Sequence, residues 1–542
     1  MEKHVPHLPP LWGRSAWNRE CDSTTGGGRS DATRSFRDSQ DSNAEASTPL
    51  VSAPHPPQHR VRDVAATSPT EGGGEAATYT RKFAPHLAVC LIAATILAGL
   101  AAGRGTQPVR AAAAPYGVDP QPGFAPMSAA SCSASACHGG QAGKFGGEHT
   151  AWAPEVNPHG EHDPHSKAYR VLFNADSVHI AKLLGGGPAH KNSLCLNCHS
   201  PAGGAEGVGC SACHGSGEKW LDVHYLPEWK AKSNRDKWTE YGFVPTKNLT
   251  ARISNCATCH VGSADREVNH DLIAAGHPRL AFEYTRFHFS GTYRKHWEER
   301  TPQPDFEVRA WLIGQAATAR AAVDVLHARA VNAKANKAPW PEFAGYSCFA
   351  CHQNVGDRDP KGTLGLPGWE VWHTATLDAA ATRSHTLFTG VKQPALVQFE
   401  ALKKLMAQAN PKPAQVEAAS AAARAELDAW LADLQAAEDA NPRSPNAGTH
   451  AADATFFLTM SAGKSEDWDA LAAHYLGVAA MFHATGGAKA HPLTKGPLTA
   501  IRGDLRFPKS FNNPAGFDRV KFNRVRGEFQ NLLNAAIEER SR

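Results

Sequence analysis

Residues 195 to 214 read CLNCHSPAGGAEGVGCSACH, and this stretch repeats one short pattern. Each half has two cysteines separated by two residues, and a histidine directly after the second: Cys195, Cys198 and His199, then Cys210, Cys213 and His214. The spacing has a chemical reason, because two thiols can add to the two vinyl groups of one haem while the adjacent imidazole binds its iron. The stretch therefore predicts two covalently attached haems and a fold built around them.

The same pattern occurs at three more places along the chain. CATCH at 256 to 260 and CFACH at 348 to 352 keep the regular spacing, whereas CSASACH at 132 to 138 has four residues between its cysteines. We therefore expect about five c-type haems, each with one iron. The predicted attachment residues are Cys132, Cys137, Cys195, Cys198, Cys210, Cys213, Cys256, Cys259, Cys348 and Cys351, and the predicted proximal ligands are His138, His199, His214, His260 and His352.

Two other chemistries use similar cysteine patterns. A C-x-x-C pair is half of a common zinc site, and cysteine-rich exported domains can be disulfide scaffolds. Neither requires a histidine after every second cysteine, and His accounts for only 28 of the 542 residues, so haem is the favoured interpretation. In the stretched motif two extra residues must loop out, and Cys132 could instead be a bystander while Cys137 forms a single bond.

The first 114 residues predict a tail and a targeting segment. Residues 1 to 80 are rich in Ser, Arg, Asp, Gly, Pro and Thr without apolar periodicity, so we expect disorder, or a start site placed too early. Within 81 to 114, Arg81 and Lys82 precede an apolar run, as in a signal peptide or an inner-membrane anchor. Export to the periplasm agrees with the cysteines, because haem is attached outside the cytoplasmic membrane in bacteria.

Composition divides the remainder into two expected domains. Residues 115 to 366 are rich in Gly, Pro, His and Trp, as in a multihaem cytochrome c domain whose short helices and loops wrap the haems. Residues 367 to 542 are Ala-rich and lack cysteine, which predicts a helical domain. The expected fold class is thus mainly α with much irregular loop. The net charge of +4 is small, and the basic residues are spread along the chain, so composition does not point to nucleic acid.

Apolar periodicity predicts four long helices, at about 306 to 330, 413 to 436, 466 to 484 and 517 to 538. Pro411 and Pro413 mark the beginning of the second of these, and Ser465 is the expected N-cap of the third.

Each iron also has a sixth coordination position, which separates an electron carrier from a catalyst. Histidines outside the motifs are numerous enough to fill these positions. His149 and His224 follow motif histidines by eleven and ten residues, His165 lies at a helix start after Asp163-Pro164, and His270 and His277 flank one short segment. We therefore expect distal ligands among these five histidines. Arg279, Arg286 and Lys295 could pair with haem propionates or simply be surface charges.

Three stretches carry a family resemblance. CATCHVGSADREVNHDLIAAGHPRLAFE (256 to 283), GVGCSACHGSGEKWLDVH (207 to 224) and DPHSKAYRVL (163 to 172) resemble the cytochrome c-554 family, which is related to the haem cores of hydroxylamine oxidoreductase and pentahaem nitrite reductase. The resemblance covers about residues 129 to 300. It implies haems stacked in close pairs and distal ligation by His149, by His224, and by either His270 or His277. The fifth motif and the stretched first motif depart from the family pattern.

The sequence favours an exported multihaem c-type cytochrome that carries electrons between redox protein partners. In this interpretation paired histidines fill both axial positions of each iron, and no residue is catalytic. The alternative is an oxidoreductase that acts on a small nitrogen or sulfur oxyanion at one five-coordinate haem. A C-x-x-C-K motif, typical of the catalytic haem in pentahaem nitrite reductases, does not occur in the sequence.

Overall fold

The computed structural model describes residues 115–117, 126–141, 144–153, 163–288, 305–352, 368–440, 467–484, 495–505 and 519–541. The tail and the targeting segment predicted within residues 1 to 114 lie outside these ranges. The described chain is mainly helical with irregular connections, and its only β-pairing consists of two isolated bridges. The mainly α fold class expected from the sequence is therefore confirmed at that level.

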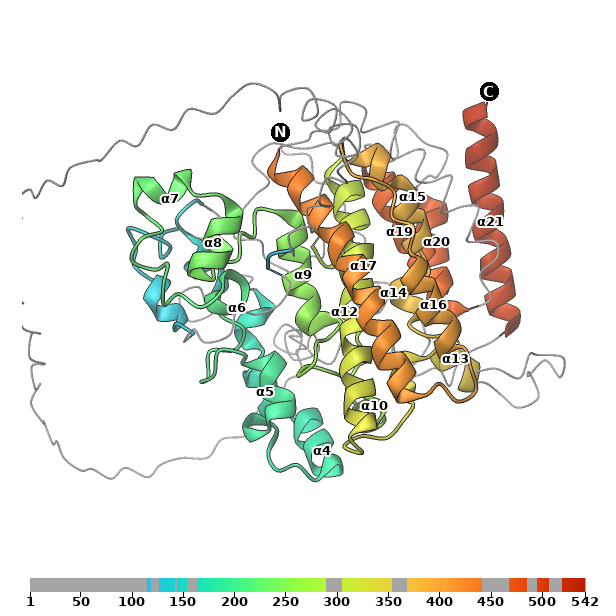
Figure 1. Cartoon of the computed structure of the whole chain (residues 1–542), viewed down its shortest axis with the longest axis horizontal. Coiled ribbons are helices and arrows are strands. Elements are labelled where there is room, and N and C mark those ends of the chain that lie inside the picture. The colour runs from blue at the N-terminus through green and yellow to red at the C-terminus, as the bar shows by residue number, and fades with distance from the viewer. Residues whose placement is uncertain are drawn as a thin grey trace, which may run out of the picture. The chain divides into compact units, whose positions relative to one another are not determined.

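The half of the structure that carries the first four motifs is built from short helices (Figure 1). Many of them begin with an Asn, Ser or Asp side chain that accepts a backbone N–H, such as Asn192 and Asn248. The elements are η2 (Ala129–Cys132), α3 (Glu148–Trp152), η3 (Pro164–Lys167), η4 (Arg170–Phe173), α4 (Ala175–Leu184), η5 (Ala189–Lys191), α5 (Ser193–His199), α6 (Cys210–His214), α7 (Pro227–Ala231), α8 (Asn234–Tyr241), α9 (Leu249–His260), α10 (His270–Ala274) and α11 (Tyr284–His288).

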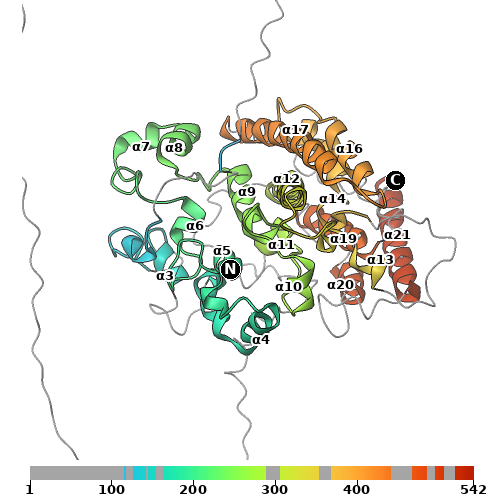
Figure 2. The same ribbon diagram turned by 60° about the horizontal axis from the view of Figure 1, so that its bottom comes forward.

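The helix α12 (Phe306–Lys334) is the centre of the other half. Most of its 29 residues are buried, with apolar side chains such as Trp311 and Leu312 on several faces, as expected of a helix that is covered all round. Figure 2 views α12 nearly end-on, with neighbouring helices grouped around it. Those that pack directly on it include α9, α11, α14 (Val371–Thr374), α15 (Leu377–Leu387), α17 (Pro413–Asp439) and α19 (Trp468–Ala484).

The remaining elements are η6 (Phe343–Gly345), α13 (Cys348–Cys351), α16 (Val397–Met406), α20 (Lys495–Asp504) and α21 (Arg519–Ser541). All four long helices predicted from periodicity are present, as α12, α17, α19 and α21, and Pro413 is the first residue of α17 as expected. One apolar cluster runs through these helices, from Leu249 to Leu533, so the core draws residues from both sides of residue 366.

The predicted cap of α19 was wrong. The helix begins at Trp468, and the carboxylate of Asp467 accepts the backbone N–H groups of Asp469 and Ala470. A carboxylate directly before a helix is as good a cap as a hydroxyl, so two candidates lay close together in the sequence. Ser465 itself lies outside the described residues.

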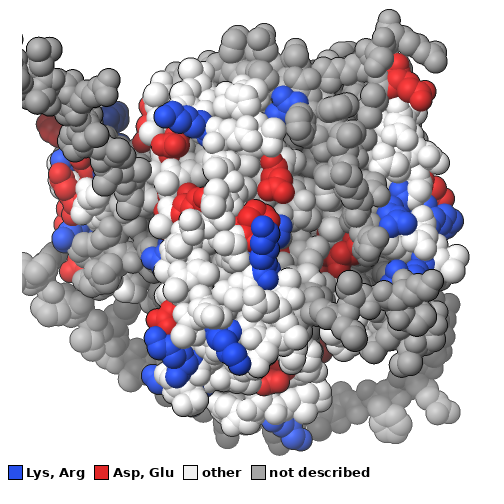
Figure 3. All heavy atoms as spheres, turned by 45° about the vertical axis from the view of Figure 1, so that its right-hand side comes forward, with Lys and Arg blue, Asp and Glu red and all other residues white. Residues whose placement is uncertain are grey.

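Charged side chains of both signs are interspersed on the face drawn in Figure 3, over the part of it that the structure describes. This agrees with the spread of basic residues along the sequence. Of the helices within the described ranges, none is both long and apolar enough to cross a membrane.

Candidate haem-binding sites

The motifs lie at the ends of short helices. The helices α5, α6 and α9 end at His199, His214 and His260, so each regular motif forms the last turn of its helix. Positions i, i+3 and i+4 share one face of a helix, and both thiols and the imidazole of a motif therefore project to the same side. At the fifth motif, α13 spans both cysteines and His352 follows directly. We number the motifs in chain order as sites 1 to 5.

Four motif histidines lie opposite a second histidine from outside the motifs. The ring centres are 6.2 Å apart for His138 and His224, 6.4 Å for His199 and His277, 5.9 Å for His165 and His260, and 6.3 Å for His270 and His352. An iron that binds one nitrogen of each ring, at about 2 Å per bond, holds the two ring centres about 6 Å apart. These four pairs therefore have the spacing that two axial imidazoles need.

In five of these eight histidines the outer ring nitrogen, Nδ1, is within hydrogen-bond distance of an acceptor. Nδ1 of His165 lies 2.8 Å from the Asp163 carboxylate, and Nδ1 of His138 lies 3.0 Å from that of Glu148. A metal-binding imidazole usually donates its second N–H in this way, which fixes the tautomer and leaves Nε2 for the metal. Backbone carbonyls do the same in three further cases: Ala168 for His199, Leu221 for His224 and Pro278 for His277.

Burial keeps several of these imidazoles neutral. It lowers the pKa of His260 to about 3 and that of His277 to about 4, and it also lowers the pKa of His199. Burial acts on His165 in the same direction, but the attraction and hydrogen bond of Asp163 outweigh it, so the pKa of His165 is raised. A neutral ring keeps the lone pair that a metal ion needs, so the raised pKa of His165 makes protons stronger competitors with a metal ion at this ring.

At site 3 the motif histidine contacts the ring of a phenylalanine. The ring of His214 stacks on Phe243 with centres 6.0 Å apart, and Phe243 also contacts Trp220 and Trp229. The contact follows from the backbone, because the N–H of Val244 donates to the His214 carbonyl. Gly215 permits this close approach, since a Cβ there would lie 2.0 Å from the carbonyl oxygen of Gly242.

The sequence pattern gave no reason to single out Phe243. His149, the remaining distal candidate, is not a member of the four pairs. It lies on α3, where its N–H donates to the His138 carbonyl and its ring contacts Trp152 at 5.9 Å.

Cysteines from different motifs lie against one another. The thiol of Cys210 hydrogen-bonds Cys132 and lowers the pKa of Cys132 to about 7, and Cys198 acts in the same way on Cys259, whose pKa falls to about 6. Cys132 of site 1, whose role the sequence left open, thus lies beside Cys210, the first cysteine of site 3. Sites 1 and 3 are neighbours, and so are sites 2 and 4.

Two further contacts complete the order of the sites. The Asn255 amide on α9 donates to the carbonyls of Ala212 and Cys213 on α6, which joins sites 3 and 4. His270 and His277 lie opposite the histidines of sites 5 and 2, so one short segment joins these two sites. The sites therefore follow one another in the order 1, 3, 4, 2, 5.

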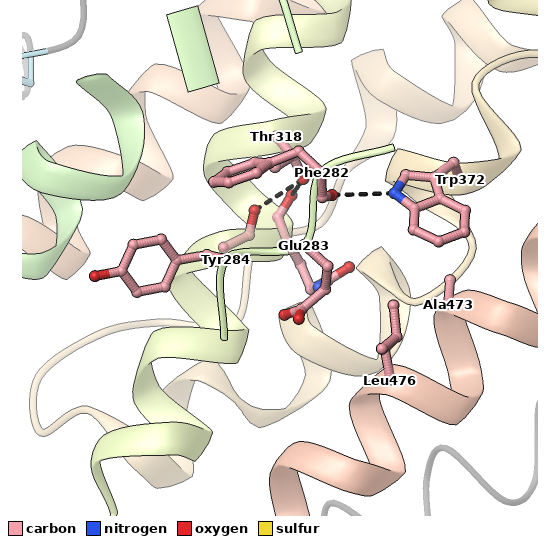
Figure 4. Close-up of a pocket in the computed structure, with 9 residues that line it drawn as sticks. Phe282, Glu283, Tyr284, Thr318, Trp372, Ala473 and Leu476 are labelled. Atoms are coloured by element: carbon pink, nitrogen blue, oxygen red, sulfur yellow. Dashed lines mark hydrogen bonds between the residues drawn. The ribbon is translucent and has the colours of Figure 1, made fainter. Parts of the chain in front are cut away.

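Two cavities lie beside the helices of sites 4 and 5. The smaller one, drawn in Figure 4, lies between α12, α14 and α19, and Trp372 forms part of its wall. The indole Nε1 of Trp372 donates to the Phe282 carbonyl at 3.0 Å. The larger hollow, of about 60 Å³, includes Cys348 and Arg279 in its lining. Arg279 donates two hydrogen bonds to Asp469, of 2.6 and 2.5 Å. The two side chains form a buried ion pair, so Arg279 is not a surface charge.

No protein-family model matches this chain, and neither a curated protein nor a solved structure matches it. Across the described residues there is also no group of three or more His, Cys, Asp or Glu side chains arranged to hold a metal ion. Haem iron takes four ligands from its porphyrin, so it needs no more than two side chains.

Proposed function

We propose that the protein is an exported multihaem c-type cytochrome that carries electrons between redox protein partners. The observation that carries this proposal is the set of four histidine pairs, with ring centres 5.9 to 6.4 Å apart, each of which includes one motif histidine. Each pair would hold one haem iron between two imidazoles, and an iron held in this way would favour one-electron chemistry over substrate binding.

The side chains at each site would have different roles. The motif cysteines would form thioethers with the haem, and the paired histidines would bind its iron through Nε2. Asp163, Glu148 and the backbone carbonyls orient the rings through Nδ1. Bound haem supplies reversible one-electron oxidation and reduction, at a potential that these contacts and burial adjust.

The order of the sites supports transfer along the molecule. Successive sites in the order 1, 3, 4, 2, 5 share thiol contacts, a side-chain hydrogen bond or one short segment. Sites 1 and 5 are the two ends, so donor and acceptor would approach near the first and the fifth motif. The resemblance to the cytochrome c-554 family agrees with such close stacking.

Haem content and electron paramagnetic resonance of the oxidised, full-length protein test the proposal together. We expect five haems per chain, with low-spin ferric signals from the four paired sites. His165→Ala should convert one haem in five to a high-spin form, because the alanine removes one of the two imidazoles at site 4. His179→Ala is the matched control, since His179 is an exposed histidine on the nearby α4 and belongs to none of the pairs.

A chain without haem would overturn the proposal. A low-spin spectrum that His165→Ala leaves unchanged would contradict the assignment of site 4. A high-spin signal from one haem in five of the unaltered protein would favour the oxyanion-converting alternative, and nitrite, hydroxylamine and nitric oxide would then be the first substrates to screen.

A further inference from the structure

Residues 170 to 194 fold into a small lobe beside site 2, which we call the α4 lobe. It comprises η4, α4, η5 and the first turn of α5, and these elements pack on one another around a core of Leu172, Ala181 and Ala189. Cys195, the first attachment cysteine of site 2, packs against the same core. The helix α4 lies at the edge of the described chain in both ribbon views (Figure 1, Figure 2).

The surface of the α4 lobe is rich in apolar side chains. Twelve large apolar side chains are exposed within the described ranges, and four of them lie in these 25 residues: Phe173, Val178, Leu183 and Leu194. Single exposed apolar residues are normal on a soluble protein, whereas a group of them in one place marks a surface that binds something. The α4 lobe is therefore a candidate interaction surface.

One side of α4 faces the interior. Ala181 belongs to the core of the α4 lobe, and Ile180 lies beside Gly276, the residue before His277 of site 2. Residues follow one another around a helix at about 100° each, so Ile180 and Ala181 fix the direction of the interior. The paired histidines of site 2 are thus approached from this side of α4.

The opposite side of α4 faces solvent. Lys182 is exposed there, and Val178 and Leu183 project on either side of it, with 57% and 58% of their side chains exposed. A haem held between the histidines of site 2 would lie towards the interior side, so it would leave Val178 and Leu183 uncovered. Another molecule is needed to bury them.

The exposed charge on the α4 lobe is mainly positive. Arg170, Lys182 and Lys191 are exposed, and Asp176 is the only acid among residues 170 to 194. The holoprotein as a whole would be acidic, because two propionates on each of five haems outweigh the chain's net charge of +4. A local basic surface on an acidic protein steers a negatively charged partner to that place and orients it.

We propose that the α4 lobe docks an acidic redox protein, whose carboxylates meet Arg170, Lys182 and Lys191 while apolar side chains pack on Val178 and Leu183. The inference rests on the function proposed above and adds a docking surface to the two ends of the series. One electron passes between the partner's cofactor and the iron of site 2, and no bond forms or breaks. Site 2 is next to site 5 in the order of the sites, so an electron received there is one step from that end.

Stopped-flow reduction of the full-length holoprotein by reduced flavodoxin, a small acidic redox protein, tests the role of the charges. Arg170→Glu combined with Lys182→Glu and Lys191→Glu should lower the second-order rate constant at low salt by about tenfold or more, because attraction becomes repulsion. The difference should shrink as salt is added, since salt screens exposed charges. The absorbance spectrum and haem content should stay unchanged.

Lys337→Glu combined with Lys404→Glu and Lys412→Glu is the matched control. These three lysines are exposed outside the α4 lobe, so the net charge changes equally while the lobe stays basic. We expect a rate constant close to that of the unaltered protein. Equal rate constants in the two triple variants would overturn the proposal.

Val178→Ser tests the apolar contact, with Val397→Ser as its control, because Val397 is a similarly exposed valine at the beginning of α16. The apparent dissociation constant for flavodoxin, taken from the saturation of the rate, should rise about threefold or more in Val178→Ser and stay unchanged in Val397→Ser. If the two valine variants bind flavodoxin equally, the apolar face does not take part and the proposal is overturned.

Vesicles of anionic phospholipid provide the last comparison. If the triple variant of the α4 lobe loses binding to them but keeps its rate with flavodoxin, the lobe meets a membrane surface and the proposal is overturned. Failure of the proposed function would look different, because a chain without haem would not be reduced at all. Five haems per chain with equal rates in all variants would overturn the docking surface alone.

Discussion

When an imidazole binds a metal through one nitrogen, the hydrogen bond at its other nitrogen adjusts how strongly the ring donates electrons to the metal. At site 4 the hydrogen bond from His165 ends on the carboxylate of Asp163, whereas at site 2 that of His277 ends on a backbone carbonyl. A carboxylate gives more negative charge to the ring and so stabilises ferric iron more strongly. The two sites therefore differ in a property that a single substitution can change.

Asp163→Asn should raise the midpoint potential of one haem in five while all low-spin signals remain. The amide oxygen can still accept the Nδ1 proton and cap η3, but the negative charge is gone. Redox titration with resonance detection measures the shift. Asp176→Asn, an exposed acid in the first turn of α4, is the control and should change no potential. A new high-spin signal in Asp163→Asn would mean that the carboxylate is needed to position the ring and does not only adjust its potential.

The prediction of proximal ligands depends only on a local pattern. A histidine after the second cysteine lies on the same helical face as both thiols, whatever the rest of the chain does. Distal partners depend on tertiary structure instead. The family resemblance implied that either His270 or His277 is a distal ligand. In the structure α10 ends at Ala274, and the two rings lie opposite histidines of different sites. The family resemblance named His149 and His224 together. In the structure the ring of His224 lies opposite His138, and that of His149 contacts Trp152.

At the scale of elements, the beginning of α19 is attached to the fifth motif. Asp467 caps the helix and accepts a hydrogen bond from Ser347, the residue before Cys348. Burial, with repulsion from Asp469, raises the pKa of Asp467 from 3.8 to about 6. The folded state therefore holds a proton on this carboxyl over a range where the unfolded chain releases it.

This attachment predicts a pH dependence of stability. Between about pH 4 and pH 6 the folded state binds more protons at Asp467 than the unfolded state, so this group lowers the free energy of unfolding as pH rises. The gap between 3.8 and about 6 corresponds to at most about 3 kcal/mol. Asp467→Asn keeps the cap but cannot ionise, so its thermal midpoint, followed by circular dichroism, should fall less over this window. Equal slopes in the two proteins would contradict the raised pKa.

At the scale of the whole molecule, the apolar core includes residues of two motif helices, α9 and, through Phe349, α13. The helix α9 begins in the apolar cluster with Leu249 and Ile253 and ends in the motif of site 4. Site 4 is also the middle of the order 1, 3, 4, 2, 5, with contacts to site 3 through Asn255 and to site 2 through Cys259. The motif of site 4, whose helix begins in the apolar core, thus connects sites 1 and 3 with sites 2 and 5.

Removing site 4 should therefore separate the remaining sites into two groups. Cys256→Ala combined with Cys259→Ala would leave sites 1 and 3 on one side and sites 2 and 5 on the other, and electron exchange slows steeply with distance. After rapid injection of one electron, we expect the redistribution among haems, followed by optical absorbance, to split into a fast phase within each group and a much slower phase between them. Cys348→Ala combined with Cys351→Ala removes an end site and also leaves four haems, but these stay connected and should equilibrate in the fast phase alone. If the two four-haem variants behave alike, the sites do not form the linear order inferred from their contacts.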